Sequence, residues 1–268
     1  MKVGIYFNKT KNIDEKNRQH LISLLEEANI EYLFFEEGKL EAGIDFLLAF
    51  GGDGTILYLA DFASKNDIPI IGINFGKLGF LTEFELDEID LAIKMLKDKD
   101  YKIDKRSMLK VDVNKESFYA LNDVVLERVY EEGQLNLVIN VLVKIDNNVV
   151  DCINGDGVIV GTPTGSTAYS LSAGGDVLAP EISGNIMTPI NAHSLHNRSI
   201  VFSSSSEMVL TLANNDKASL LLDGKRQKIL SDKDKVVINQ SPYSVKFLRK
   251  KNFNFYGRLL SKLNRKGY

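Results

Sequence analysis

Cysteine is almost absent from this sequence. Cys152 is the only one among 268 residues, and there is no tryptophan. A single cysteine excludes an intramolecular disulfide and any zinc site built from several cysteines. Among the three histidines, His193 and His196 stand three residues apart, but no third ligand is apparent nearby. We therefore expect no metal site of the protein's own.

Long hydrophobic runs are missing as well. A membrane-spanning helix needs roughly 18 apolar residues, and no stretch of this chain comes near that length. The N-terminal run Val3–Phe7 is also shorter than the apolar core of a signal peptide. We therefore expect a cytoplasmic protein with no membrane partner.

The sequence also lacks a surplus of positive charge. The formal net charge is -3 and the pI is about 5.7, whereas a nucleic-acid binder needs excess Lys and Arg. We therefore expect no nucleic acid as a partner. The exception is the segment Ser241–Tyr268, which holds several basic residues and no acidic one. We expect this tail to dock on an acidic surface of the same protein rather than on a membrane.

The first hundred residues alternate strand and helix patterns. Apolar runs at Val3–Phe7, Phe46–Phe50 and Pro69–Ile73 are typical of strands covered on both faces. Between and after them, apolar residues recur with the helical period, as in Ile89, Ala92, Ile93 and Leu96. Alternating strands and helices predict a doubly wound α/β domain with a parallel sheet over residues 1–100.

After about Tyr101 the pattern becomes β-rich. Short segments such as Phe118–Leu126 and Leu135–Ile145 follow one another, separated by turn formers such as Asp223-Gly224. This pattern predicts a β-sandwich-like domain over residues 101–248. Apolar residues at helical spacing then predict a terminal helix within residues 249–268 that packs back on the first domain; they are Tyr256, Leu259, Leu260 and Leu263.

A glycine-rich turn holds the most informative carboxylate. Gly51-Gly52-Asp53-Gly54-Thr55 follows the buried strand Phe46–Phe50 and leads into an expected helix. Ligands of parallel sheets bind at the carboxyl ends of strands, and a glycine turn at a helix start suits a phosphate. A carboxylate there can accept a hydroxyl proton or assist Mg²⁺, as phosphoryl transfer requires. The alternative is that Asp53 merely caps the helix.

A second motif is dense in hydroxyl groups and glycine. Asn154-Gly155-Asp156-Gly157 precedes a strand, and the run Gly161–Gly175 follows it. Hydroxyls and backbone amides can read an adenine edge, and Tyr169 offers a flat ring with an O–H group. The alternative is a flexible linker, but linkers rarely carry Leu, Ala and Tyr between their small residues.

Together these motifs resemble those of the NAD kinases. The first is shared with diacylglycerol and sphingosine kinases and, more loosely, with phosphofructokinases, whereas the second is similar to the NAD-binding segment of NAD kinases. Asn74–Leu81 and Leu121–Leu126 also resemble that family, in the same order along the chain. The resemblance implies an α/β domain and a β-rich domain with the active site between them.

The resemblance also implies residue roles. Asp53 would be catalytic and act on the 2′-hydroxyl of the adenosine ribose of NAD. The phosphates of ATP would be served by Gly51, Gly52 and Thr55. NAD would be bound by Asp53, Gly54, Asn122, Asp123, Asn154, Asp156, Thr164, Thr167, Ala168, Tyr169, Ser170, Leu171, Ser172 and Ala192. This chain departs from some family members at two positions. It has Asn154 where they have Arg, and Asp123 where they have Glu.

The expected function is therefore transfer of the γ-phosphoryl group of ATP, or of polyphosphate, to NAD, which gives NADP. A divalent cation, Mg²⁺ foremost, would accompany the nucleotide, and a homo-oligomer, dimer or tetramer, is expected. Two alternatives stay open. A lipid kinase could use the same glycine turn, although it needs no dinucleotide pocket; a non-catalytic NAD-binding regulator would have no need of Asp53.

Overall fold

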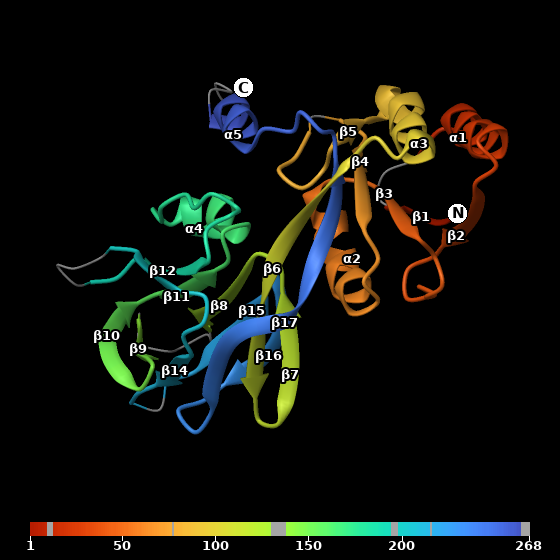
Figure 1. Cartoon of the computed structure of the whole chain (residues 1–268). Coiled ribbons are helices and arrows are strands. Elements are labelled where there is room, and N and C mark those ends of the chain that lie inside the picture. The colour runs from red at the N-terminus through yellow and green to blue at the C-terminus, as the bar shows by residue number, and fades with distance from the viewer. Residues whose placement is uncertain (10–12, 77, 130–137, 194–197, 215, 264–268) are drawn as a thin grey trace. The chain divides into compact units, whose positions relative to one another are not determined.

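The chain folds into two compact units. The computed structural model describes residues 1–9, 13–76, 78–129, 138–193, 198–214 and 216–263. Unit 1 comprises Met1–Arg106 and Ser244–Tyr268, and unit 2 comprises Ser107–Tyr243. The chain passes from one unit to the other inside two long strands, β6 (Lys102–Val113) and β17 (Lys235–Arg249) (Figure 1).

Unit 1 is built on a parallel sheet. Its strands lie in the order β17, β4, β3, β1, β2, and the short strand β5 pairs with β4. The continuous apolar runs predicted from the sequence form its central strands. The bounds are β1 (Lys2–Phe7), β2 (Glu31–Phe35), β3 (Phe46–Phe50), β4 (Ile70–Asn74) and β5 (Phe84–Glu85).

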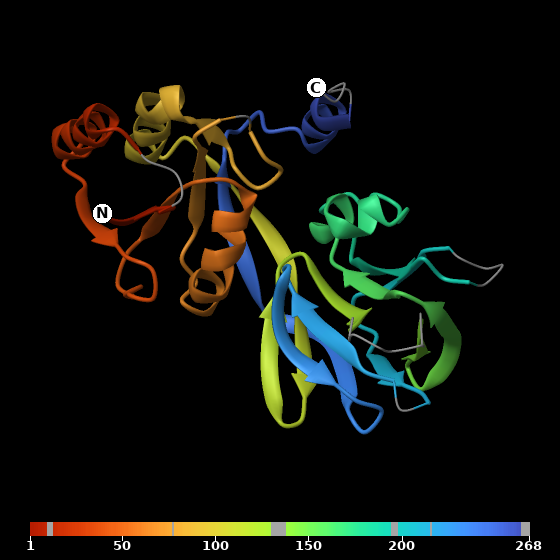
Figure 2. The same ribbon diagram turned by 180° about the vertical axis from the view of Figure 1, so that it is seen from behind.

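Helices cover both faces of this sheet. One face packs in a buried cluster with α1 (Glu15–Glu27) and α3 (Ile89–Asp98), which follows the short 3-10 helix η1 (Leu86–Glu88). The opposite face meets α2 (Asp53–Lys65), where the Tyr6 and Tyr58 rings lie 5.5 Å apart. The predicted doubly wound α/β arrangement is confirmed, and Figure 2 shows these helices from behind.

Unit 2 is a sandwich of two antiparallel sheets. One has the strand order β13-β12-β11-β8-β15-β16, and the other holds β10, β9, β14 and parts of β17 and β6, with β7 beside β6. The bounds are β7 (Glu116–Ala120), β8 (Asp123–Arg128), β9 (Ile139–Ile145), β10 (Asn148–Gly155), β11 (Gly157–Gly161), β12 (Gly184–Ile190), β13 (Ile200–Ser203), β14 (Met208–Leu212), β15 (Ala218–Leu222) and β16 (Lys225–Leu230).

The core of unit 2 lies between these sheets. Val141 and Leu210 come from one sheet and Leu126, Val158 and Leu220 from the other, and all are at most 1% exposed in one cluster. The expected sandwich-like fold is confirmed. Two short helices, η2 (Gly165–Thr167) and α4 (Tyr169–Ser172), follow β11.

One expected strand is divided in the structure. The sequence predicts a single strand at Phe118–Leu126, whereas β7 ends at Ala120 and β8 begins at Asp123. The backbone N–H groups of Leu121 and Asn122 bond to a side chain instead of continuing the ladder. This break determines the geometry of the site described below.

The terminal helix, α5 (Phe255–Leu263), belongs to unit 1, as expected. The basic tail does meet acidic groups of the same unit: Lys246 lies 2.6 Å from Asp67, and Lys250 lies 2.7 Å from Glu88. The helix is buried through Phe255, whereas three of its apolar residues stay exposed, namely Tyr256, Leu260 and Leu263. The predicted intramolecular docking is confirmed, and it includes ion pairs as well as the buried Phe255.

Candidate functional site

The glycine turn joins β3 to α2. The Gly51 N–H donates to the carbonyl oxygen of Ile73 at 2.9 Å, which ties the turn to the neighbouring strand. A Cβ atom on Gly51 would overlap the side chain of Thr55, so only glycine fits there. The Thr55 hydroxyl is buried and accepts a hydrogen bond of 2.8 Å from the side chain of Asn8. The Thr55 side chain therefore packs inside the turn, between Gly51 and Asn8.

Asp53 is the first residue of α2, and its side chain turns away from its own helix. Gly52 is the N-cap residue, without a side-chain capping bond. The Asp53 carboxylate instead accepts backbone N–H groups from Phe80, at 2.8 Å, and from Leu81, at 3.1 Å. Asp53 is thus no helix cap, and that alternative is excluded by the geometry.

The partner loop closely surrounds this carboxylate. A Cβ atom on Gly79 would overlap Oδ1 and Cγ of Asp53, so the loop needs glycine at this position. The Gly79 N–H donates to Oγ1 of Thr82 at 2.8 Å, and Thr82 is fully buried. Of the stretch Asn74–Leu81, residues Gly79, Phe80 and Leu81 are thus brought against Asp53, and Lys77 lies outside the described residues.

In unit 2, the break between β7 and β8 gathers three backbone donors on one carboxylate. Asp223 accepts N–H groups from Leu121 at 2.9 Å, from Asn122 at 2.7 Å and from Asp123 at 3.2 Å. Burial raises the pKa of Asp223, and these three hydrogen bonds oppose the rise. The sequence indicated Asp223-Gly224 only as a turn, so this positioning carboxylate was missed. Its sole signal was the Asp-Gly pair.

Asp123 is itself an unusual carboxyl group. It is only 4% exposed. Burial, together with the negative charge of Asp223, raises the pKa of Asp123 to about 7. At neutral pH this carboxyl is therefore partly protonated and can donate as well as accept a hydrogen bond.

The end of β11 packs against this break. The Thr162 hydroxyl donates to the Leu121 carbonyl oxygen at 2.6 Å, and the Thr162 N–H donates to the carbonyl oxygen of Asn122 at 2.9 Å. A Cβ atom on Gly165 would overlap that same carbonyl oxygen. Two motifs that are far apart in the sequence, Asn122-Asp123 and the run after Gly161, thus form one surface.

The hydroxyl-rich residues after this point face in different directions. Ser170 is fully buried, and its hydroxyl bonds to that of Thr188 at 2.8 Å. Thr164 is nearly buried, and its carbonyl oxygen accepts from the Thr167 hydroxyl at 3.1 Å. Tyr169 is 41% exposed. Ser170 therefore supports the fold, whereas the Tyr169 side chain is exposed.

A second group lies at the other end of β11. Asp156 is held by Arg128, with Nε 2.9 Å from Oδ1, and accepts from the side chain of Asn191 at 2.8 Å. Asn154 donates to the side chain of Asn140 at 2.8 Å. A Cβ atom on Gly155 would lie 2.8 Å from Cα of Ala192. The expected residues Asn154, Asp156 and Ala192 are therefore neighbours.

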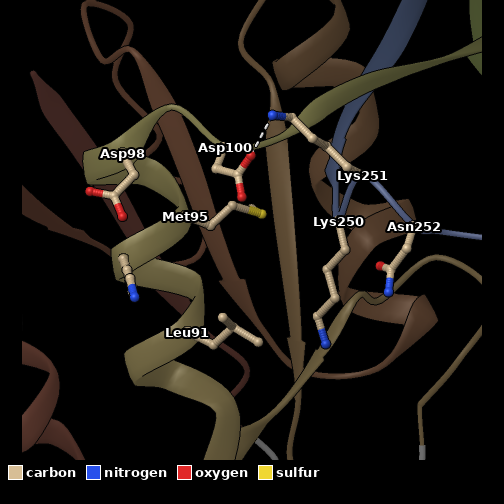
Figure 3. Close-up of a pocket in the computed structure, with 8 residues that line it drawn as sticks. Leu91, Met95, Asp98, Asp100, Lys250, Lys251 and Asn252 are labelled. Atoms are coloured by element: carbon tan, nitrogen blue, oxygen red, sulfur yellow. Dashed lines mark ion pairs between the residues drawn. The ribbon is translucent and has the colours of Figure 1, made fainter.

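Unit 1 has two hollows on its surface. One, of about 430 Å³, lies at the carboxyl end of β4, and its lining includes Phe75 and Gly76 of the stretch discussed above. The other, of about 400 Å³, lies between α3 and the segment Lys250–Asn252; Met95 lines it, and Lys251 and Asp100 form an ion pair beside it (Figure 3). None of the expected site residues lines the second hollow.

Comparison with known proteins defines the class. The family model described as "ATP-NAD kinase N-terminal domain" matches residues 3–101, and the model described as "ATP-NAD kinase C-terminal domain" matches residues 125–250. An NAD kinase of Caldicellulosiruptor bescii is 35% identical, over 98% of this chain and 99% of that relative. One from Carboxydothermus hydrogenoformans is 39% identical, over 82% of this chain and 79% of its own.

Solved structures share the fold. A yeast NADH kinase complexed with NADH has a TM-score of 0.84 at 23% identity and covers all of this chain and 89% of its own. An NAD kinase from Archaeoglobus fulgidus in complex with ATP has a TM-score of 0.79 at 24% identity, with both chains fully covered. The chain belongs to the NAD kinase family, and it is an enzyme, a kinase that acts on NAD. Within the described ranges, no helix is both long and apolar enough to cross a membrane.

Proposed function

We propose that this enzyme transfers the γ-phosphoryl group of ATP to the 2′-hydroxyl of the adenosine ribose of NAD, which yields NADP. The observation that carries the proposal is the Asp53 carboxylate, which is partly exposed at a helix start and oriented by two backbone N–H groups. The relatives named as NAD kinases and the solved structures with ATP and NADH support the choice of substrates.

Asp53 would act on the acceptor hydroxyl. Each of its oxygens accepts one backbone N–H, so each retains acceptor capacity for a further partner. The loose transition state of phosphoryl transfer needs little bond formation before the proton leaves, so orientation of the hydroxyl is the main requirement. We propose that Asp53 orients the 2′-hydroxyl and receives its proton.

The adenosine half of NAD would bind beside the break between β7 and β8. Asn122 and Asp123 would bond to ribose and adenine edges, and the exposed Tyr169 ring would offer a stacking face. Thr164, Thr167, Ala168 and Leu171 would line this pocket, and Gly54 would contact the substrate beside Asp53. Ser170 would contribute indirectly, because its hydroxyl is already bonded to Thr188.

The nicotinamide half would meet the residues at the opposite end of β11. Asp156 is a fixed acceptor there, since Arg128 and Asn191 hold it in place. Asn154, Ser172 and Ala192 would complete this part of the pocket. A five-residue strand rises about 13 Å, which gives an extended ligand room to reach from one group to the other.

The phosphates of ATP would approach the glycine turn. Gly52 has open space where a Cβ atom would project, so a phosphate can come close to the backbone there. Gly51 and Thr55 would serve indirectly by holding the turn. We propose that the divalent cation, Mg²⁺ foremost, comes with these phosphates, and the remaining acceptor capacity of Asp53 suits a water ligand of such an ion. When bound, it would neutralise charge on the transferring group.

We further propose a cytoplasmic homo-oligomer, dimer or tetramer, with contacts through unit 2. Its edge strand β10 carries Val149, which is 62% exposed, and an open strand edge favours association. Sedimentation at micromolar concentration tests this, and a monomer throughout would contradict it.

The decisive experiment is an NADP-formation assay with the purified chain and Mg²⁺. NAD and NADH are each offered as acceptors, with ATP or polyphosphate as donor, alongside diacylglycerol and sphingosine. Formation of 2′-phosphorylated NAD with ATP supports the proposal. A 3′-phosphorylated product, or binding of NAD without turnover, would refute it.

A further inference from the structure

The loop Gly79–Thr82 is bonded on both of its sides. On one side, its N–H groups at Phe80 and Leu81 point to the Asp53 carboxylate. On the other side, its carbonyl oxygens accept from two arginines of the last segment of the chain. Because the C=O of one residue and the N–H of the next share a rigid peptide plane, each peptide group here connects an arginine to Asp53.

The first connection passes through Gly79. Nη1 of Arg258, on α5, donates to the Gly79 carbonyl oxygen at 3.1 Å. The N–H of the same peptide group, at Phe80, donates to Oδ2 of Asp53 at 2.8 Å. Arg258 also donates to the Thr82 carbonyl oxygen at 3.0 Å, which fixes the far end of the loop.

The second connection passes through the next peptide group. Nη2 of Arg249, at the end of β17, lies 3.4 Å from the Phe80 carbonyl oxygen. The N–H of that peptide group, at Leu81, donates to Oδ1 of Asp53 at 3.1 Å. Nη1 of Arg249 also donates to the Leu81 carbonyl oxygen at 2.9 Å. Both oxygens of Asp53 are thus connected to a cation through one peptide group each.

The two arginines are themselves firmly held. Arg249 is fully buried and lies 3.2 Å from both Glu83 and Asp104. Arg258 is 3.4 Å from Glu83, whose side chain is 2% exposed. Both guanidinium groups also lie over the ring of Phe253, with centroid distances of 4.6 and 5.6 Å. This arrangement leaves the arginines little freedom to move away from the loop.

We propose that Arg249 and Arg258 are positioning residues for Asp53, acting through the peptide groups between Gly79 and Leu81. This inference rests on the proposed catalytic role of Asp53. Hydrogen bonds in a chain polarise one another, so a cation on the carbonyl side strengthens the N–H bond on the other side. The last strand and α5 therefore serve catalysis as well as folding.

The test uses Arg258, because Arg249 is fully buried and pairs with both Glu83 and Asp104, so its loss would disturb the fold as well as the loop. Arg258→Met keeps the apolar stem and removes the donors, whereas Arg258→Lys keeps the charge. We expect Arg258→Met to lower kcat by about 10- to 100-fold with a small change in the KM for NAD, and Arg258→Lys to recover part of the loss. The matched control is Lys251→Met, which breaks an exposed ion pair with Asp100; the contacts described for Lys251 include no hydrogen bond or ion pair with the loop.

Two further readouts separate positioning from general damage. If Arg258 acts through Asp53, adding Arg258→Met to Asp53→Asn causes no further loss of kcat, whereas independent effects would multiply. Amide hydrogen exchange at Phe80 and Leu81 should be at least about tenfold faster in Arg258→Met and unchanged in Lys251→Met. Multiplying losses in kcat, or unchanged exchange at both amides, would overturn the proposal.

The exchange measurement does not depend on turnover. If the wild-type chain formed no NADP, the proposed function would fail, while exchange at Phe80 and Leu81 would still report whether Arg258 holds the loop. The two failures are therefore distinguishable.

Discussion

Asp53 in unit 1 and Asp123 in unit 2 are each the first residue of their element, α2 and β8, yet their surroundings differ. Asp53 is partly exposed and receives two N–H donors from a loop that two arginines hold. Asp123 is buried beside a second carboxylate, Asp223, and its pKa is raised to about 7. One arrangement orients a carboxylate through backbone donors, whereas the other raises the pKa of a carboxyl so that it can carry a proton.

This comparison shows that the same residue type can have different chemical roles, which depend on its surroundings in the fold. A carboxylate that accepts a hydroxyl proton must stay ionised and reachable. A carboxyl that recognises a ribose or base edge can be buried and can benefit from donating a hydrogen bond. The expected consequences differ as well: changes at Asp53 should act on the rate, and changes in unit 2 on binding and stability.

Removal of the charge at Asp53 should have the largest effect. Asp53→Asn keeps the shape and part of the hydrogen bonding, but loses the negative charge and the proton acceptor. We expect kcat to fall by at least about a hundredfold, with a much smaller change in NAD affinity. Steady-state kinetics and NAD titration measure the two separately. A correctly folded variant that retains most of its kcat would show that Asp53 is not catalytic.

The buried carboxyl of Asp123 predicts a pH-dependent stability. Its folded-state pKa of about 7 lies above the unfolded value of about 3.9, so the folded protein binds this proton more tightly. The stabilisation is complete below about pH 4 and is lost as the pH rises to about 7. Asp123→Asn has no such proton. Its unfolding free energy, relative to wild type, should therefore rise by about 2–3 kcal/mol between pH 5 and pH 8.

Urea unfolding without NAD, at several pH values in this range, gives this difference directly. Parallel stability curves for wild type and variant would contradict the raised pKa of Asp123.

Crowding at Gly79 should weaken catalysis without removing the carboxylate. In Gly79→Ala the new methyl group overlaps Asp53, so either the loop or the carboxylate has to move. A displacement of about 1 Å can cost about a hundredfold in rate, and we expect a fall in kcat of about 10- to 100-fold. The control is Gly257→Ala on α5, where a Cβ atom would come no closer than 3.7 Å to Asn254. Equal kinetics for the two variants would argue against a need for glycine at position 79.

Much of the fold could be predicted because its signals are local. The run at Phe46–Phe50 and the helical period of Ile89–Leu96 each lie within one element, and the run at Pro69–Ile73 differs from β4 by one residue at each end. β12 was missed, since Pro189 and Gly184 are unusual in a strand. The glycine turn was predicted as well, because its residues are adjacent in the chain.

The missed contacts are those between distant segments. Asp223 bonds to backbone N–H groups about a hundred residues away, and nothing in the sequence near it indicates that partner. Likewise, the hydrogen bonds between Asp53 and the Phe80 N–H and between Arg258 and the Gly79 carbonyl oxygen depend on how strands are ordered in the sheet. The apolar stripe of α5 suggested the wrong packed face, because Phe255 and ion pairs hold the segment instead.

The smallest effect is expected at Asp156, which also tests whether unit 2 acts mainly in binding. Its carboxylate is fixed by Arg128 and Asn191 and is about a quarter exposed. Asp156→Asn removes the charge but keeps one acceptor, so a hydrogen bond to NAD is weakened rather than abolished. We expect the KM for NAD to rise by about three- to tenfold with kcat within about twofold.

The matched control for Asp156 is Asp151→Asn on β10, because Asp151 bonds only to the neighbouring Cys152 N–H among the contacts described for it. This control should leave both constants unchanged. A fall in kcat for Asp156→Asn at saturating NAD would mean that this end of β11 also contributes to the transition state. Unit 2 would then contribute to catalysis as well as to binding, because a contact that acts equally in the ground state and the transition state changes KM and leaves kcat unchanged.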